Sequence, residues 1–406
     1  MRLDASLREA IRTRLSDVAA EMSVWEGAEC MSDELALKLR QSIVLFQHTK
    51  TATDLSCAGV DSSGDFPALA YSDSFVYLTV ASAAVYRSDS GCGLREVESG
   101  IRPFFDAFWI PDSDKARREA WDGAFSRMVG MSVADVVGSS DYQLLKARLS
   151  GRKSSSSTLV ENLIRPLASD VSNVGIQLRA SSELAMALQV LTTGFEHSAG
   201  HKILLIDGTL TLPLVTRRDV SLFYEHLKRL CCVEAERRDV AFIAVSRSHG
   251  MRGMDVIDFA AREVAGKQAG EGVDHWYLRI PTEEGEGWTL PMTADRRIPP
   301  AGAVSYLVRF HSNVPVMRLD VDANFWTARI QGNPDCEAAM FEALDYCTHE
   351  QTGYGQLHPL HASRARTRLS ESERRFLRGQ LVDEAVRAGL KRSQFRDTAQ
   401  SAVGEV

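Results

Sequence analysis

The segment Ile203-Leu-Leu-Ile-Asp207-Gly-Thr209 is an uninterrupted apolar run that ends on an aspartate followed by small residues. A run this uniformly apolar predicts a strand buried on both faces, which is typical of parallel sheets in α/β proteins. A second segment, Ala58-Gly-Val-Asp61-Ser-Ser-Gly64, ends in the same way. Because ligands gather at the carboxyl ends of central strands in open α/β sheets, both aspartates are candidate site residues. Alternatively, each aspartate caps the turn after its strand.

The remaining pattern predicts a mixed sheet with helices on its faces. A Tyr-rich meander follows Asp61 and ends near Tyr86, which favours antiparallel strands there. Farther along, strands alternate with helices, which indicates an α/β fold. Strands are expected at 202–207, 240–246, 275–280, 303–310 and 316–321, and helices at 159–191, 219–238, 334–348 and from about 359 onward.

Three parts of the chain are expected from these patterns. Apolar residues at three- and four-residue spacing predict an N-terminal helical arm over residues 1–50. The main domain is expected over 51–375. Within it, 101–158 is interpreted as an inserted helical lobe with aromatic anchors, followed by a Ser-rich loop. A basic helix and tail are expected over 376–406.

Composition indicates a globular protein. The 406 residues are 44% hydrophobic and 25% charged, which excludes a wholly disordered chain. No stretch of 18 uncharged apolar residues occurs, and the N-terminus carries charges where a signal peptide would be apolar. We therefore expect a cytoplasmic protein that does not enter a membrane. The seven cysteines show no zinc-binding spacing and are expected to be reduced.

Charge is distributed unevenly along the chain. Residues 361–396 contain ten Lys or Arg and four Asp or Glu, a net charge of +6, so the other residues carry −13 of the total of −7. A basic segment on an acidic body suits contact with nucleic-acid phosphates. A solvated helix face explains the same pattern without a ligand.

Glu183 adds a third carboxylate to the two aspartates. The helix expected around it has an apolar stripe at three- and four-residue offsets, and Glu183 lies on that stripe. A carboxylate facing a sheet is costly unless it is paired. Either Arg179, one turn earlier, pairs with it, or a cation does.

Several fragments, in this order, resemble the successive motifs of NurA-domain nucleases over most of residues 50–375. The resemblance rests on Ala58-Gly-Val-Asp-Ser-Ser63 with its Tyr-rich meander, Arg179-Ala-Ser-Ser-Glu183, Leu204-Leu-Ile-Asp-Gly-Thr-Leu210, Ile243-Ala-Val-Ser-Arg-Ser248 and Pro359-Leu-His-Ala-Ser-Arg-Ala-Arg-Thr-Arg-Leu-Ser370.

This resemblance implies an RNase H-like fold and a manganese-dependent nuclease acting on DNA ends and single strands. It also implies a homodimer that works with the hexameric DNA-translocating ATPase HerA in DNA end resection, repair or defence. Asp61, Glu183 and Asp207 match the family's acidic metal ligands, which are expected to hold two ions of Mn²⁺ or Mg²⁺ through oxygen atoms alone.

Three motifs depart from the family pattern. The first has Asp61-Ser62-Ser63 where the family usually has Asp-Gly-Ser, which is a mild change because small residues are kept. Arg247 stands where a lysine is common, and it is expected to contact DNA phosphate. In the C-terminal motif, gapless alignment puts Gln356 at the family's tyrosine and Arg364 at its histidine. Tyr354 and His361 lie two and three residues away, and we expect these two near the scissile bond, with Arg364 on phosphate.

Two other functions are consistent with the sequence. A catalytically silent RNase H-like subunit would keep the fold and bind DNA ends or dock on an ATPase, and the altered C-terminal motif supports it. A metabolite-binding α/β protein would use the strand-end carboxylates to hold a magnesium-bound phosphate compound. The basic C-terminal segment and the lack of a Gly-rich phosphate loop count against that protein.

Overall fold

A computed structural model divides the chain into two compact units. The structure describes residues 5–26, 33–49, 54–64, 67–72, 74–89, 93–111, 114–138, 172–196, 198, 200–210, 218–247, 254–268, 271–280, 303–348 and 355–396. The smaller unit covers 1–44 and 250–273, and the larger covers 45–249 and 274–406.

The smaller unit is helical in the part described. It contains α1 (Ala5–Glu26), α2 (Asp33–Ser42) and α9 (Met254–Val264). Helices α2 and α9 pack together, with an ion pair of 2.6 Å between Arg40 Nε and Glu263 Oε2. Helices are therefore present in the N-terminal segment, and α2 packs against a helix from the middle of the chain.

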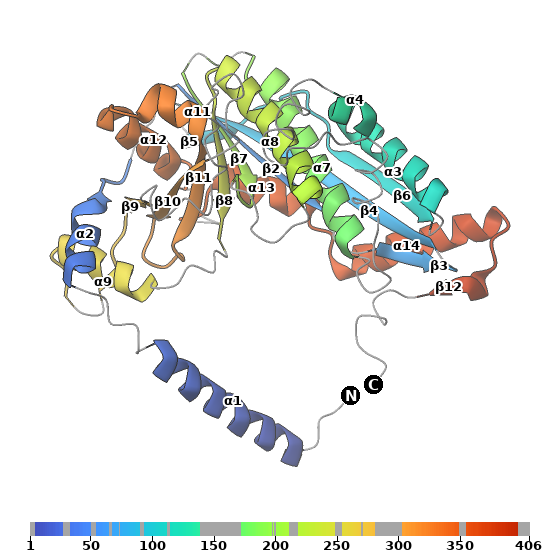
Figure 1. Cartoon of the computed structure of the whole chain (residues 1–406), viewed down its shortest axis with the longest axis horizontal. Coiled ribbons are helices and arrows are strands. Elements are labelled where there is room, and N and C mark those ends of the chain that lie inside the picture. The colour runs from blue at the N-terminus through green and yellow to red at the C-terminus, as the bar shows by residue number, and fades with distance from the viewer. Residues whose placement is uncertain are drawn as a thin grey trace. The chain divides into compact units, whose positions relative to one another are not determined.

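One mixed sheet organises the larger unit (Figure 1). Its strands follow the order β9-β10-β11-β8-β7-β2-β4-β3-β12, and β5 and β6 both pair with β4. The bounds are β2 (Leu55–Ser63), β3 (Pro67–Tyr71), β4 (Ser74–Asp89), β5 (Gly93–Glu96), β6 (Phe104–Pro111), β7 (His201–Asp207), β8 (Ala241–Ser246), β9 (Trp276–Arg279), β10 (Ala303–Arg309), β11 (Met317–Asp322) and β12 (Phe395–Arg396), and the short β1 is Ile43–Leu45.

The centre of the sheet is parallel and its wings are antiparallel. Strands β2, β7 and β8 run parallel, whereas β4 joins β2 and β11 joins β8 in antiparallel pairs. The two apolar runs identified in the sequence are β2 and β7, and both are buried along most of their length. This arrangement, with helices on the faces, confirms the expected α/β class.

Helices cover both faces of the sheet. Apolar residues on one face of β2 and β7 pack with α3 (Asp114–Val129), α7 (Ser172–Gln189) and α8 (Arg218–Arg237). On the other face, alternate residues pack with α12 (Pro334–Tyr346) and α13 (His358–Thr367). The C-terminal helix α14 (Glu371–Arg387) begins with a capping box at Ser370 and Glu373. The described residues also contain short helical turns: α4 (Val133–Gly138), η1 (Val190–Gly194), α11 (Ala323–Phe325), η2 (Trp326–Ile330) and η4 (Arg392–Gln394).

Gly59 permits an unusually close contact between β2 and α13. A Cβ at this position would lie 2.3 Å from the carbonyl of Pro359 and from the backbone nitrogen of Leu360. Carbon atoms cannot approach backbone this closely, so only glycine allows α13 to lie against the middle of β2. The first turn of α13 is thereby fixed on the central strand.

We expected a helical lobe over 101–158, and this prediction is wrong for its first residues, which form a strand. Phe104–Pro111 is strand β6, which pairs with β4 along its whole length. Helical structure begins at Asp114 with α3 and continues in α4 (Val133–Gly138). The rest of the expected lobe and the Ser-rich loop lie in 139–171, outside the described residues.

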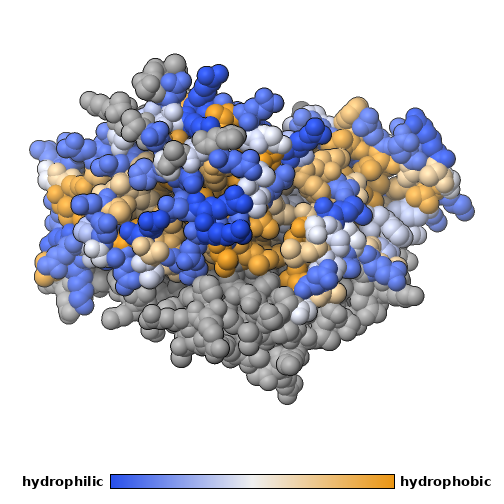
Figure 2. Space-filling model, turned by 90° about the horizontal axis from the view of Figure 1, so that it is seen from above, coloured by the Kyte–Doolittle hydropathy of each residue, from blue (hydrophilic) through white to orange (hydrophobic). Residues whose placement is uncertain are grey.

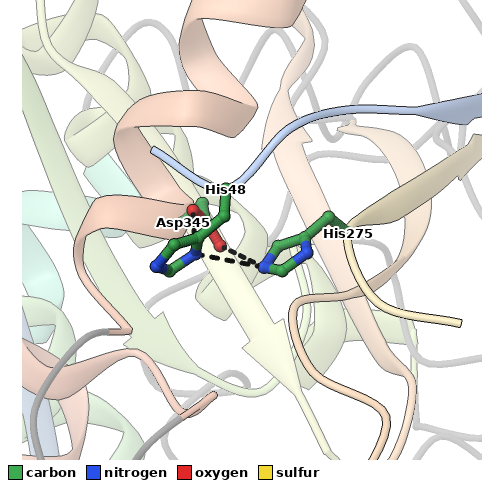
Figure 3. A group of neighbouring side chains, drawn as sticks. All are labelled: His48, His275 and Asp345. Atoms are coloured by element: carbon green, nitrogen blue, oxygen red, sulfur yellow. Dashed lines mark hydrogen bonds and ion pairs between the residues drawn. The ribbon is translucent and has the colours of Figure 1, made fainter. Parts of the chain in front are cut away.

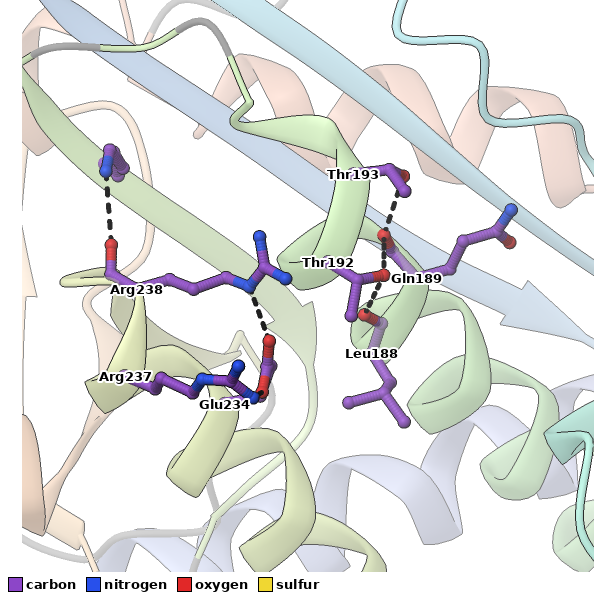
Figure 4. A network of polar contacts seen from close by, with 8 residues as sticks. Leu188, Gln189, Thr192, Thr193, Glu234, Arg237 and Arg238 are labelled. Carbon is purple, nitrogen blue, oxygen red and sulfur yellow. Dashed lines mark hydrogen bonds and ion pairs between the residues drawn. The ribbon is translucent and has the colours of Figure 1, made fainter.

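A widened helical turn ends α7. Residues Val190–Gly194 form a π-helical segment, and the hydroxyls of Thr192 and Thr193 donate to the carbonyl of Gln189 at 2.9 Å (Figure 4). Nearby, Lys202 Nζ donates to the carbonyl of Arg238 at 3.1 Å, which joins the start of β7 to the end of the α8 region. The two threonines satisfy a carbonyl group at the helix end that leads into β7, and Lys202 satisfies one at the end of α8, before β8.

The surface shown in Figure 2 mixes hydrophilic and apolar residues. Apolar patches lie between clusters of charged and polar side chains on this face. Among the helices in the described ranges, none is long and apolar enough to cross a membrane.

Candidate metal and phosphate site

Asp61 and Asp207 lie side by side at the carboxyl ends of two adjacent parallel strands. The register of β2 and β7 pairs Val60 with Ile206, so the two aspartates follow directly after that pair. Side chains alternate along a strand, and both aspartates point to the face that carries α13. The two aspartates that the sequence places at strand ends are therefore neighbours in the fold.

The Asp61 carboxylate is buried and contacts α13. Only 5% of the residue is exposed, and its carboxylate accepts a hydrogen bond from the Thr367 hydroxyl. Burial raises the pKa of Asp61, and the negative charge of Asp207 raises it further, while Thr367 and Arg364 act in the opposite direction. Asp61 is therefore a carboxylate for which a neighbouring positive charge is favourable.

Glu183 approaches the same strand end from α7, on the opposite face of the sheet. Ser62, which points to that face, donates to Glu183 Oε2 at 2.9 Å and lies 3.2 Å from the carbonyl of Arg179. The other oxygen, Glu183 Oε1, is buried without a hydrogen-bond partner. Burial and the charge of Asp61 raise the pKa of Glu183 to about 8, although the positive charge of Arg179 lowers it. The positive charge of Arg179 therefore interacts with this carboxylate, but the effect of burial is larger.

An arginine from α13 binds Asp207. Arg364 Nη2 lies 3.0 Å from Asp207 Oδ2, and both side chains are partly exposed. Arg364 is the residue that gapless alignment places at the family's histidine. The structure thus puts a permanent positive charge, which cannot exchange a proton, against one of the candidate metal ligands.

Arg247 lies beside this ion pair at the end of β8. Its guanidinium Nη1 donates to Gln356 Oε1 at 3.1 Å. Burial lowers the pKa of Arg247 and the charge of Arg364 lowers it further, while Asp207 and Asp61 raise it. Two arginines and two aspartates therefore interact electrostatically at the ends of the central strands. This arrangement suits a phosphate group held next to carboxylates.

His361 and Tyr354 are the other two residues that the sequence predicts near the scissile bond. His361 lies on α13 one turn before Arg364, half-buried, and its backbone nitrogen donates to the carbonyl of Leu357 at 3.0 Å. Within the described contacts, its side chain has no hydrogen bond to Asp61, Glu183 or Asp207. Tyr354 lies outside the described residues.

Three polar residues that the sequence analysis did not select support the site. Thr367 binds Asp61 and Ser62 binds Glu183, as described above. The third is Asp320 on β11, whose carboxylate accepts from the Thr209 hydroxyl and, at 3.1 Å, from the backbone nitrogen of Leu210. Asp320 thereby holds the turn that follows Asp207. The only sequence signal for Thr367 is its position three residues after Arg364, on the same helix face.

The donor atoms fit a hard divalent cation in their chemistry. All three carboxylates offer oxygen, and the buried Glu183 Oε1 has no other partner. Across the residues that the structure describes, however, the oxygens of Asp61, Glu183 and Asp207 do not all lie within 4.8 Å of one another. The structure therefore shows two interacting aspartates, with the glutamate reaching the same strand end from the other face.

Comparisons with known proteins give structural similarity without sequence similarity. No family model and no curated protein sequence matches the chain. The chain resembles solved NurA nuclease structures over nearly its whole length. For the NurA nuclease from Sulfolobus solfataricus, the TM-score is 0.48 and the identity 12%, covering 96% of this chain and 99% of that one.

Two further solved structures were crystallised with ligands. NurA with manganese aligns with a TM-score of 0.39 and 11% identity, over 95% of this chain and 99% of that one. NurA bound to dAMP and manganese aligns with a TM-score of 0.36 and 10% identity, over 91% of this chain and 95% of that one.

Proposed function

We propose that this protein is a metal-dependent DNA nuclease that hydrolyses phosphodiester bonds. The observation that carries the proposal is the pair of aspartates at adjacent parallel strand ends, with two arginines beside them and a buried glutamate behind them. Carboxylates that repel one another favour a cation, and arginines favour a phosphate. A phosphodiester next to a divalent ion satisfies both requirements.

In this proposal Asp61, Glu183 and Asp207 hold Mn²⁺ or Mg²⁺, with two ions as the expected number. Bound ions would supply activation of water and stabilisation of the leaving 3′ oxygen. Thr367 orients Asp61, and Gln356 orients Arg247 toward the phosphate. Arg364 neutralises phosphate charge, and the placement of His361 and Tyr354 near the scissile bond stays a prediction.

The direct test incubates the purified protein with linear single- and double-stranded DNA and Mn²⁺. We expect cleavage by the wild type and its loss in Glu183→Gln and in Asp207→Asn, since an amide keeps the shape of the side chain but loses its charge. Asp239→Asn, which changes an exposed carboxylate after α8, serves as the matched control. Cleavage within a few-fold of wild type in either site variant would remove that residue from the site.

We infer a homodimer that acts on DNA ends and single strands with a HerA-like hexameric ATPase in end resection, repair or defence. The motif order in residues 50–375 supports this partnership. Co-expression is expected to give a complex whose activity on long duplex DNA requires ATP hydrolysis. Full degradation of long duplexes by the isolated protein without ATP would argue against it.

The ion pair between Arg364 and Asp207 favours a second candidate function. A guanidinium that occupies Asp207 competes with a cation for the same oxygen, which is the arrangement expected of a catalytically silent DNA-binding or ATPase-docking subunit. Such a subunit would bind DNA in a salt-dependent manner, with Mn²⁺ neither activating cleavage nor raising the melting temperature. The same incubation therefore separates the two functions.

A further inference from the structure

A second cluster of ligating side chains lies in the larger unit and belongs to no part of the proposed nuclease site. It consists of His48, His275 and Asp345 (Figure 3). His48 follows β1, His275 immediately precedes β9, and Asp345 lies near the end of α12. Figure 3 shows both imidazole rings directed at the same carboxylate.

The three side chains converge on one point. His48 Nδ1 lies 3.1 Å from Asp345 Oδ2, and His275 Nε2 lies 3.3 Å from Asp345 Oδ1. The two imidazole nitrogens are 3.2 Å apart. In a tetrahedral site with metal–ligand bonds of about 2.0–2.1 Å, neighbouring ligand atoms are separated by about 3.3 Å. The two imidazole nitrogens have about this separation, and each lies at a similar distance from one oxygen of the Asp345 carboxylate, Oδ2 for His48 and Oδ1 for His275. One atom from each of the three residues lies within 4.8 Å of the other two, which is close enough for a single ion to contact all three.

The surroundings hold these ligands in place. Asp345 is fully buried, and its Oδ2 accepts from the backbone nitrogen of Thr49 at 2.8 Å. His275 adopts a left-handed backbone conformation with φ of 56°, which costs energy in a residue other than glycine. The ring of Phe46 packs edge-on against His275, with ring centroids 5.7 Å apart. Ligands in an ordered metal site are typically fixed by hydrogen bonds and surrounded by apolar side chains, as Asp345 and His275 are here. Strained backbone, as at His275, is also common at functional sites.

We propose that His48, His275 and Asp345 form a zinc-binding site. Two imidazoles and one carboxylate suit Zn²⁺ better than Mg²⁺ or Ca²⁺, which select oxygen ligands. Three protein ligands leave the fourth tetrahedral position for water. The ion would join three segments that are 227 and 70 residues apart along the chain, and so stabilise the folded larger unit.

The first measurement needs no change to the proposed zinc ligands. Protein carrying Asp61→Asn and Asp207→Asn, so that the carboxylate site cannot compete, is stripped with chelator and titrated with Co²⁺ or Zn²⁺. We expect one ion per chain, a cobalt visible spectrum of four-coordinate intensity, and imidazole scattering in the zinc X-ray absorption spectrum. A zinc spectrum without imidazole scattering, or no binding, would overturn the proposal.

Ligand variants provide the second measurement. Replacing a residue that only orients a ligand weakens metal binding about 10–100-fold. Loss of a direct ligand in His48→Gln, His275→Asn or Asp345→Asn should therefore weaken zinc binding at least about 100-fold. His201→Gln, at an exposed histidine on β7, should leave it unchanged. Asparagine is chosen at residue 275 because it tolerates positive φ.

Folding of the variants is checked by thermal melting with and without zinc. Zinc should raise the melting temperature of the Asp61→Asn, Asp207→Asn parent in a concentration-dependent manner, and this rise should disappear in the three ligand variants. His48→Gln is the variant least harmful to folding because the His48 side chain is one-third exposed. An undiminished zinc response in folded His48→Gln would contradict the proposal.

Discussion

Glu183 is the residue whose environment departs most from that of an ordinary carboxylate. It lies on an apolar helix stripe, one oxygen has no hydrogen-bond partner, and its pKa is raised to about 8. Its unfolded-state value is near 4.5. Because the raised pKa belongs to the folded state, the contribution of Glu183 to stability is fully present below about pH 4.5 and is lost as pH rises through about 8.

Glu183→Gln should remove this pH dependence. In the presence of chelator, the variant should become progressively more stable than wild type as pH rises from about 4.5 through 8, since wild type must then bury a charge. Thermal melting across this pH range measures the difference. A constant difference between variant and wild type would show that Glu183 does not titrate in this interval.

Arg364 and His361 can be separated by their different chemistry. Arg364 stays protonated, so Arg364→Ala should mainly weaken DNA binding. Because Arg364 is already paired with Asp207, the salt slope should fall by at most about one. His361 can accept or donate a proton, and His361→Ala should lower cleavage at least about tenfold. Steady-state cleavage at saturating DNA distinguishes them. If Arg364→Ala loses turnover and His361→Ala cleaves DNA at the wild-type rate, the catalytic position belongs to Arg364.

At the scale of elements, the contact between β2 and α13 depends on Gly59. Gly59→Ala would force a Cβ against the backbone of Pro359 and Leu360, and we expect a loss of about 3 kcal/mol or more in stability because backbone cannot move as a side chain does. Gly379→Ala is the matched control. Gly379 lies in exposed helix α14 with open space around it, so alanine should stabilise by about 0.5–1 kcal/mol. Chemical denaturation of both variants measures the contrast.

Asp322 caps the short helix α11 (Ala323–Phe325) from a buried position. It accepts from the Phe325 backbone nitrogen at 3.2 Å, and burial raises its pKa to about 6. Its stabilising contribution is therefore present below about pH 3.8 and is lost as pH rises through about 6. Asp322→Asn keeps an acceptor for the cap and should remove up to about 3 kcal/mol of pH-dependent stability. Denaturation at pH 4 and pH 7 checks this, and equal pH dependence in both proteins would contradict it.

The sequence predicts an element correctly where the spacing of its apolar residues matches the way the element is buried in the fold. Strands β2 and β7 are apolar throughout, and their terminal aspartates were the clearest signal in the chain. Strand β6 was misread because Phe104, Phe105, Phe108 and Trp109 recur at a spacing that resembles a helix stripe. In the structure Phe105 and Trp109 point to the exposed side of the strand, with 54% and 59% exposure. The hydrogen-bonded pairing of β6 with β4 therefore decides the structure of this segment, and the helix-like spacing of its aromatic residues does not.

At the scale of the whole molecule, the basic C-terminal segment is partly neutralised by its own acidic residues. Arg375 pairs with Glu371, Arg387 with Glu384 and Arg392 with Asp383, as the ion pairs show. An arginine already paired releases fewer counterions when it meets a phosphate. The number of phosphate contacts should thus be smaller than the ten basic residues suggest.

The difference between paired and unpaired arginines can be measured by the salt dependence of DNA binding. Arg368 and Arg374 are exposed and carry no ion pair among the described contacts. If both contact phosphate, changing them together to alanine should reduce the slope for single-stranded DNA by about 1.4. Changing the paired Arg375 and Arg387 together should reduce it less. Equal reductions would show that the ion pairs open on DNA binding.

The zinc candidate shows what a sequence alone does not reveal. His48, His275 and Asp345 have no motif spacing, because they come from a chain segment after β1, a turn before β9 and the end of α12. Isolated histidines have many roles, and only the fold brings these three together. In contrast, Asp61 and Asp207 could be chosen in advance because strand ends in parallel sheets converge by topology.

The hydrogen bond between Thr367 and Asp61 spans 306 residues of sequence. Protein synthesis proceeds from the N-terminus, so β2 emerges long before the helix that completes its surroundings. Until α13 has been made, Asp61 lacks Thr367, Asp207 lacks Arg364 and the space above Gly59 stays open. The nascent chain therefore cannot assemble this set of side chains, and a chain cut short before residue 364 would carry the aspartates without their cationic partner.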